Sequence, residues 1–378
     1  MRNIWRIILI VFAVLACLLI LVWPMAPLWE KLGADPVCIG GTWPDLKITD
    51  CTNHKAAVTA IPLPTPGADG PLPIIVDDDG SPDGSIALLY FLNNPLFDVR
   101  AVTISYGEAH PEKFAPHVAQ ILAAAGRTDI PVGYGKDAPL EGTNAFPESW
   151  RQASDEFWGL SLPQAIGATK PVPAAKLIAD TITKSEKPVT LFISGSHTNL
   201  AEALRLDPDI ATNIRGVYIM GGSVNIPGNI HSDWPEFENE AAEWNIWVDP
   251  LAASEVFSSG LPLHLVPLDA TRQVVWRQTD VPGWKSGALE SKLAGDLLQW
   301  MLDNWSRDGI FIWDLVAAVQ ATDPGACPEV QMALEVVTAL GPEEGRTKVV
   351  SQPPKISVCL EPNPGVVKSI AASVFQQP

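Results

Sequence analysis

Four aspartates follow a short apolar run near the start of the main body of the chain. The run is Ile74-Ile75-Val76, the acidic residues are Asp77, Asp78, Asp79 and Asp83, and apolar residues resume at Ile86. This pattern predicts a strand, an acidic turn and the start of a helix. Carboxylates crowded at one end of a strand repel one another, and a bound divalent cation commonly neutralises them. The turn therefore indicates a metal site, and the alternative is a solvated loop whose aspartates cap the next helix.

Three further segments gather polar or small residues at predicted strand ends or helix starts. They span residues 194–200, 220–250 and 313–318, and the last places Asp314 at the head of an apolar helix. Each segment alone could hold only turn residues and helix caps. Together with the acidic turn they predict one site built from distant parts of the chain.

Short apolar strands alternate with longer amphipathic stretches along the chain. We expect strands at 99–104, 132–134, 189–194, 216–220 and 263–267, and helices at 114–125, 174–183, 200–206 and 250–257. This alternation predicts an α/β fold, a single open and mostly parallel sheet with helices on both faces, over residues 72–378. Ligands bind beyond the carboxyl ends of the strands in such sheets, where the acidic turn falls.

The composition excludes one class of partner. The chain has 378 residues, enough for one large domain, and a formal net charge of −18. Such an acidic chain offers no basic surface to a phosphate backbone, so we expect no nucleic-acid polymer as partner.

The amino terminus carries a membrane signal. An uninterrupted apolar run from Ile7 to Trp23 follows Arg2 and Arg6. Its length and flanks favour a signal-anchor, a transmembrane helix over residues 1–29, over a cleaved signal peptide. Residues 30–71 are rich in Pro and Gly and predict a tether. The arginines before the span put the amino terminus in the cytoplasm and the domain in the periplasm or outside the cell.

Four cysteines lie beyond this span, at positions 38, 51, 327 and 359, and their spacing does not suit a zinc site. Disulfides are expected in an oxidising compartment, with Cys38–Cys51 and Cys327–Cys359 as one of three pairings. Ordinary buried thiols are the alternative.

Several blocks in order resemble the inosine-uridine-preferring nucleoside hydrolase family. The family opens with D-x-D-x-x-x-D-D after a strand, and Asp77, Asp79 and Asp83 match its first three acidic positions. The other matching blocks are Thr198-Asn199-Leu200-Ala201, Met220-Gly221-Gly222, Glu243-Trp244-Asn245-Ile246 with Val248-Asp249-Pro250, and Val266-Pro267-Leu268-Asp269. The resemblance runs from about residue 73 almost to the carboxyl terminus. It implies hydrolysis of the N-glycosidic bond of ribonucleosides with one bound Ca²⁺.

The resemblance also implies residue roles. Asp79 would be a calcium ligand and the base that deprotonates the attacking water, and the other metal ligands would be Asp77, Asp314 and the backbone carbonyl of Thr198. The substrate-binding positions would be Asp83, Asn229, Glu243 and Asn245, which match residues that hold the ribose hydroxyls, with Glu108 in place of an Asn and Trp313 in place of a His.

Two departures bear on activity. Gly84 stands where the family has the last Asp of its motif, a calcium ligand, and glycine supplies no side-chain oxygen. Asp78 is expected to point to the strand face opposite Asp77 and Asp79, which makes it a poor substitute. Trp313 can stack on a base but cannot protonate it, so His110, His197 and His231 are candidates for the missing acid.

Two alternatives remain open at this point. Asp77 and Asp79 also fit the D-x-D-G-[ST] motif of haloacid dehalogenase-type phosphohydrolases. A membrane-tethered nucleoside- or sugar-binding protein of the same fold, without catalysis, would keep the sugar contacts. Relatives in the family are commonly dimers or tetramers, which makes a homo-oligomer possible.

Overall fold

The computed structural model describes residues 70–164, 166–353 and 355–376, together with residue 67 and two short strands. These strands, β1 (Val37–Gly40) and β2 (Lys47–Asp50), pair antiparallel in a unit of residues 1–57, which is separate from the unit of residues 58–378. The predicted signal-anchor at 1–29 and most of the predicted tether lie outside the described residues. Within those ranges, no helix combines the length and apolar character that a bilayer span requires.

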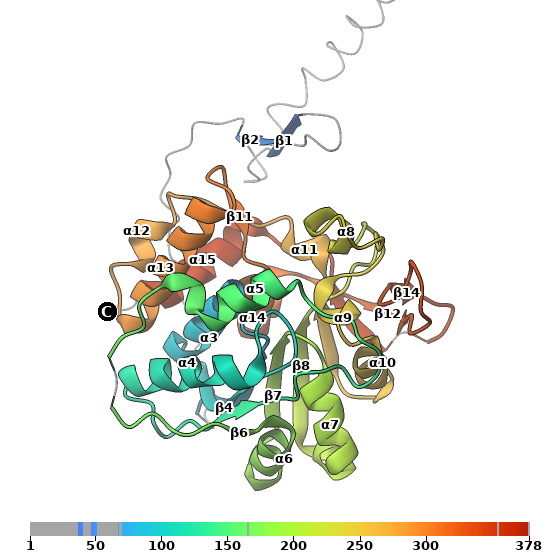
Figure 1. The fold of residues 1–378 in the computed structure, drawn as a ribbon, viewed down its shortest axis with the longest axis horizontal. Helices are drawn as coiled ribbons and strands as arrows, with labels where there is room; N and C mark the ends of the chain where they lie inside the picture. Colours follow the sequence, from blue (N-terminus) through green and yellow to red (C-terminus); the bar gives the residue numbers. More distant parts are fainter. Residues whose placement is uncertain are drawn as a thin grey trace, which may run out of the picture. The chain divides into compact units, whose positions relative to one another are not determined.

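A nine-stranded sheet forms the centre of the described part of residues 58–378 (Figure 1). Its strands run in the order β12-β15-β9-β8-β7-β3-β4-β5-β6, and all pair in parallel except β12 at one edge. The bounds are β3 (Leu72–Asp78), β4 (Phe97–Ile104), β5 (Val132–Tyr134), β6 (Val172–Pro173), β7 (Val189–Ser194), β8 (Ile214–Met220), β9 (Leu263–Val266), β12 (Glu329–Met332) and β15 (Ile356–Cys359). The prediction of a single, mostly parallel sheet is confirmed.

Helices cover both faces of this sheet, as predicted. The residues of β3 alternate between two cores, since Ile74 and Val76 face one and Ile75 faces the other. The first core holds α3 (Pro82–Asn93), α4 (Pro111–Ala124), α13 (Leu289–Asn304), α14 (Trp313–Thr322) and α15 (Pro364–Phe375). The second holds α6 (Ala174–Lys184), α7 (Thr198–Leu206) and α10 (Pro250–Ser258).

Shorter elements connect these layers. They are α5 (Glu148–Asp155), α8 (Ile230–Asp233), α9 (Trp244–Trp247), α11 (Leu268–Thr271), α12 (Val281–Trp284), the pair β10 (Val275–Trp276) and β11 (Ile310–Phe311), and the pair β13 (Leu334–Val336) and β14 (Thr347–Val349).

The acidic turn joins β3 to α3 through a glycine and a serine cap. Gly80 has φ +83°, and a Cβ on it would lie 2.4 Å from Cβ of Ala109, so a side chain fits neither its backbone nor its space. Ser81 then caps α3, because its side chain accepts a hydrogen bond from the amide of Gly84 at 3.0 Å. The aspartates are therefore not needed as caps, and the alternative reading of the turn is wrong.

The strand order creates a crevice at the acidic turn. After β3 the chain moves outward through β4, β5 and β6, and it then returns to β7 on the other side of β3. The loops that follow β3 and β7 consequently diverge, and such a switch point is where open α/β sheets bind ligands.

One disulfide lies near the edge of the sheet. Cys327, just before β12, is bonded to Cys359 at the end of β15. This confirms one predicted bridge and excludes free thiols at these two positions. The predicted Cys38–Cys51 bridge lies outside the residues whose side chains are described.

Candidate functional site

A pocket of about 570 Å³ opens at the carboxyl ends of the strands. Its volume suits a small organic ligand. Two kinds of side chain dominate its lining, carboxylates and tryptophans: Asp79, Asp83, Glu108, Asp233, Glu243 and Asp314, and Trp150, Trp158, Trp244, Trp300, Trp305 and Trp313. None of the described lining residues is a His, Lys or Arg. The pocket therefore combines oxygen donors with flat aromatic surfaces.

Asp79 lines the pocket and is held by backbone groups. We call Asp79, Asp83 and Asp314 the pocket floor. Its Oδ1 accepts from the amide of Ser81 at 3.2 Å, and its Oδ2 accepts from the amide of Glu108 at 3.1 Å. A Cβ on Gly107 would lie 2.4 Å from Asp79 Oδ2, and one on Gly195 would lie 2.5 Å from its Cβ. Glycines at both positions thus make the space that this carboxylate occupies. Burial raises the pKa of Asp79 to about 7, although the amide of Glu108 opposes the shift.

Asp83 and Asp314 meet beside Asp79, although 231 residues separate them in sequence. The amide of Asp314 donates to Asp83 Oδ2 at 3.3 Å, and the hydroxyl of Ser81 donates to Asp314 Oδ2 at 3.3 Å. Burial raises the pKa of Asp83 to about 6, and burial together with the charge of Asp83 holds the pKa of Asp314 well above its usual range. The acidic turn and the start of α14 therefore form one carboxylate cluster, as the sequence predicted.

Asp78 belongs to this cluster as well, which corrects the sequence-based expectation. It points away from Asp77, as strand alternation requires, because Asp77 contacts α7 whereas Asp78 lies against Gly84 of α3. Asp79, however, follows the last residue of β3, so alternation does not apply to it. Burial first, and then the charges of Asp79 and Asp83, hold the pKa of Asp78 well above its usual range.

Asp77 and Thr198 lie beside the pocket but not in its lining. Oδ1 of Asp77 accepts from Thr103 Oγ1 at 2.5 Å and from Asn199 Nδ2 at 2.8 Å, and burial raises its pKa to about 7. Thr198 begins α7, and its hydroxyl donates to Asp249 Oδ2 at 2.6 Å. Asp77 thus links three elements of the fold, β3, β4 and α7.

The predicted ribose-binding residues do converge on the pocket. Asn229, Glu243 and Asn245 all line it together with Asp83. Asn245 donates to the carbonyl of Met220 at 3.2 Å, which fixes its amide at the end of β8. Glu243 caps α9, and its two oxygens accept from the amides of Gly222, Asn245 and Ile246.

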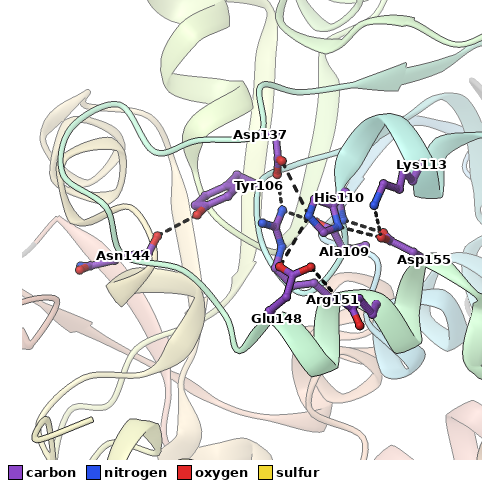
Figure 2. Close-up of polar contacts among 10 residues, drawn as sticks. Tyr106, Ala109, His110, Lys113, Asp137, Asn144, Glu148, Arg151 and Asp155 are labelled. Atoms are coloured by element: carbon purple, nitrogen blue, oxygen red, sulfur yellow. Dashed lines mark hydrogen bonds and ion pairs between the residues drawn. The ribbon is translucent and has the colours of Figure 1, made fainter. Parts of the chain in front are cut away.

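Glu108 lines the pocket from the loop after β4, and a polar network braces this loop against α5 (Figure 2). Arg151 of α5 donates to the carbonyl of Ala109 at 3.1 Å and pairs with Asp137. Asp155 of α5 accepts from both the amide and the ring of His110, at 3.0 and 2.7 Å. The network places Glu108 and Trp150 on facing elements of the same pocket.

None of the three histidines proposed as an acid lines the pocket. His110 belongs to the network with Asp155 shown in Figure 2. His197 is fully buried, neither ring nitrogen has a hydrogen-bond partner, and burial lowers its pKa to about 3. His231 Nδ1 lies 2.9 Å from the carbonyl of Phe237. The expectation of a histidine acid is therefore not met in the described residues.

Asp233 is a pocket residue that the sequence did not single out. It ends α8, and Trp244 Nε1 donates to its Oδ2 at 3.2 Å. The residue is exposed at the surface, and partial desolvation of its carboxyl raises the pKa. A carboxyl group that retains its proton to higher pH than usual can act as an acid. No motif in the sequence marked this residue.

Aromatic side chains form two sides of the pocket. On one side Phe146 stacks on Trp244 at 4.8 Å, and Trp150 lies 5.4 Å from Trp244. The other side is a chain of four lining tryptophans in successive ring contact, at 6.0, 5.9 and 6.4 Å: Trp158, Trp300, Trp305 and Trp313. Such surfaces suit a planar aromatic group.

The carboxylates of the pocket lie near one another, but their side chains are not arranged as a metal-binding group. Within the ranges the structure describes, no group of three or more His, Cys, Asp or Glu side chains is arranged to hold a metal ion. What the carboxylates of the cluster share is burial and the effect of each other's charge. They do not form a closed coordination shell.

A family model described as "Inosine-uridine preferring nucleoside hydrolase" matches residues 74–373 of this chain. A relative in Escherichia coli O1:K1, the pyrimidine-specific ribonucleoside hydrolase RihA, is 35% identical over 233 residues, 61% of this chain and 72% of the relative. The protein of the same name from Escherichia fergusonii matches to the same extent. The residues that the family model matches include the acidic turn and the start of α14.

Solved structures agree on the fold. The purine-preferring ribonucleoside hydrolase from Gardnerella vaginalis has a TM-score of 0.70 at 22% identity and covers 80% of this chain and 99% of its own. A plant nucleoside hydrolase has a TM-score of 0.70 at 24% identity, with coverages of 82% and 100%. At such identities the likeness supports the shared architecture alone.

Proposed function

The chain belongs to the inosine-uridine preferring nucleoside hydrolase family, and we propose that its pocket hydrolyses the N-glycosidic bond of ribonucleosides by a metal-activated water with Asp79 as base. One observation carries this proposal: Asp79, Asp83, Asn229, Glu243 and Asp314, drawn from distant parts of the chain, line a single pocket with tryptophan walls. The name of the 35% identical relatives supports a ribonucleoside as substrate.

The pocket fits a calcium ion by donor chemistry. Its donors are hard oxygens, and Asp78 Oδ2 is buried without a hydrogen-bond partner. Asp79, Asp314 and the carbonyl of Thr198 would hold the ion, while Asp77, which contacts Thr103 and Asn199, would position β3 beneath them. A bound calcium ion would supply a Lewis acid that lowers the pKa of a water.

Asp79 takes the proton of the attacking water. The amides of Ser81 and Glu108 fix its two oxygens, so the carboxylate keeps one orientation relative to the sugar. A fixed base of this kind needs no reorganisation when the proton moves. Water adds to the anomeric carbon, the bond to the base nitrogen breaks, and its electron pair leaves with the base.

Asp83, Asn229, Glu243 and Asn245 would bind the ribose hydroxyls. Hydrogen bonds that carboxylates accept from the sugar hydroxyls strengthen as positive charge develops on the sugar ring, so they favour the transition state over the bound substrate. Glu108 would add a carboxylate at the same side of the pocket, and Trp313 would stack on the base.

The departing base requires a proton, and we assign its donation to Asp233. This carboxyl lines the pocket, partial desolvation raises its pKa although the residue is exposed, and Trp244 Nε1 orients it. Asp233 would thus take the role of proton donor that the sequence led us to expect of a histidine.

Replacing Asp233 with asparagine should lower kcat/KM for inosine and uridine by about 10²-fold, the usual size of a general-acid contribution. Asparagine keeps the shape and can still accept from Trp244, so the pocket wall is preserved. The control substrate is p-nitrophenyl riboside, whose leaving group departs without protonation. Its hydrolysis should be unchanged in the variant, and an equal loss on both substrates would exclude Asp233 as the acid.

The overall reaction is tested by product analysis. The purified protein, incubated with uridine, cytidine, inosine and adenosine, should release free base and reducing sugar in equal amounts. The 2′-deoxynucleosides should react far more slowly, because the hydroxyl contacts of Asp83, Asn229 and Glu243 are then incomplete. Binding of ribonucleosides without release of any base would favour the non-catalytic alternative, and phosphate release from phosphomonoesters would favour the phosphohydrolase.

We also propose that residues 1–29 anchor the protein with its domain outside the cytoplasm. The apolar run Ile7–Trp23 supports this, and so does the Cys327–Cys359 disulfide, a bond found mainly in oxidising compartments. The full chain should sediment with membranes and resist extraction by salt or alkali. Recovery in the soluble fraction would contradict the anchor.

A further inference from the structure

Asp78 is a buried carboxylate whose charge the described residues only partly offset. It is 0% exposed, its Oδ1 accepts from Ser194 Oγ at 3.3 Å, and its Oδ2 has no hydrogen-bond partner. An unpaired buried charge is costly, so a group in this position retains a proton or meets a cation.

Gly84 provides the space in which this carboxylate lies. A Cβ on Gly84 would lie 1.8 Å from Asp78 Oδ1 and 2.7 Å from Asp78 Cγ. No atoms approach so closely without a bond, so a side chain at position 84 and the present Asp78 side chain exclude each other. By resemblance, position 84 is where the family has an acidic residue. This chain therefore has one carboxylate in that volume, contributed by the strand instead of the helix.

The other carboxylates of the pocket floor surround this volume. Asp79 and Asp83 act electrostatically on Asp78, and Asp78 acts in turn on Asp314. Ser194, which donates to Asp78, itself lines the pocket. Asp78 is thus directly behind the pocket floor, next to the groups that would hold the ion.

We propose that Asp78 is a metal ligand of this pocket and replaces the carboxylate that is missing at Gly84, an inference that rests on the proposed metal-dependent function. The exchange keeps the number of carboxylates at the floor while moving one of them from the first turn of α3 to the last residue of β3. Gly84 is then a requirement of the site rather than a defect in it.

Calcium binding measured by titration calorimetry on the full-length protein tests this without reference to activity. Asp78→Asn should weaken calcium binding by more than about 100-fold, since loss of a ligand should exceed the roughly 10- to 100-fold effect that is usual for a residue behind the ligands. The matched control is Asp269→Asn, a buried aspartate outside the pocket lining whose oxygens accept from the amides of Val224 and Asn225, and it should bind calcium as the wild type does. Unchanged affinity in Asp78→Asn would overturn the proposal, as would an equal loss in Asp269→Asn.

A second pair of variants moves the carboxylate from position 78 to position 84. It keeps the proposal testable even if Asp78→Asn fails to fold. Gly84→Asp alone should lower the Tm, because the new side chain meets Asp78. Asp78→Ser/Gly84→Asp removes this clash and returns a carboxylate from α3, so it should recover both the Tm and the rise in Tm on adding calcium. If the double variant folds but calcium no longer raises its Tm, the two positions are not equivalent and the proposal fails.

The outcome is separable from that of the proposed function. If the wild type releases ribose but Asp78→Asn binds calcium as tightly as the wild type does, this inference alone is overturned. Calcium binding that depends on Asp78 in a protein that releases no base would overturn the nucleosidase proposal alone.

Discussion

Asp79→Asn is expected to lower kcat for ribonucleoside hydrolysis by about 10³- to 10⁴-fold, because it removes a general base and a metal ligand in one substitution. Asparagine has nearly the same volume, so it fits the space left by Gly107 and Gly195. It cannot, however, accept a proton from water. Steady-state kinetics with inosine or uridine measure the effect, and binding of the nucleoside to the variant should persist through the remaining sugar contacts.

The control for this substitution is Asp180→Asn on α6, where the carboxylate pairs with Lys176 and Lys184 at the surface. It should retain wild-type kinetics. A folded Asp79→Asn protein with more than about a tenth of wild-type kcat would contradict the assignment of the base, given the usual size of such contributions.

The second large effect concerns pH and calcium together. In the metal-free protein, burial raises the pKa of Asp79 from 3.8 to about 7 and that of Asp83 to about 6. A raised pKa means that the folded state binds more protons, so the stability these groups contribute is present near pH 4 and is lost as pH rises towards 7. His197 acts in the opposite direction, since burial lowers its pKa to about 3 and the unfolded chain gains a proton below about 6.5.

Calcium separates the two contributions, because it acts on the carboxylates and not on His197. At pH 5 the ion must displace protons from the cluster, whereas at pH 8 the carboxylates are already ionised and repel one another. The increase in the free energy of unfolding on adding calcium should therefore be larger at pH 8 than at pH 5, by on the order of 3 kcal/mol. Urea unfolding with calcium and with chelator measures it, and equal increases at the two pH values would contradict a carboxylate-bound ion.

The fold could be predicted well because its signals are local. The strand expected at 189–194 is β7 residue for residue, and the helix expected at 250–257 is α10 with one more residue. Apolar runs bounded by turn residues specify such elements without knowledge of their neighbours. The antiparallel edge strand β12 was not predicted, since its residues are partly exposed and carry no strong apolar pattern.

The site could be predicted only where a motif marked it. Asp79, Asp83 and Asp314 meet as expected because their positions at strand and helix ends follow from the sheet topology. The position of Asp78 depended on a contact with Gly84 across the turn, which alternation along a strand does not reveal. Trp300 and Trp305 of the aromatic wall had no sequence signal, because their place beside Trp158 depends on packing between distant segments of the chain.

The same contacts weigh against the phosphohydrolase alternative. That reaction needs Asp77 as a nucleophile that faces the substrate, but Asp77 accepts from Thr103 and Asn199 and does not line the pocket. The carboxylate that does face the pocket is Asp79, which suits a base for water.

The central claim is that this pocket hydrolyses ribonucleosides through a metal-activated water. The most direct measurement is ribose release from inosine and uridine by the purified full-length protein, first after chelator treatment and then after calcium is restored. We predict no release above background with chelator and full recovery with calcium. Release at the same rate with chelator, from protein shown to contain no metal, would contradict the claim.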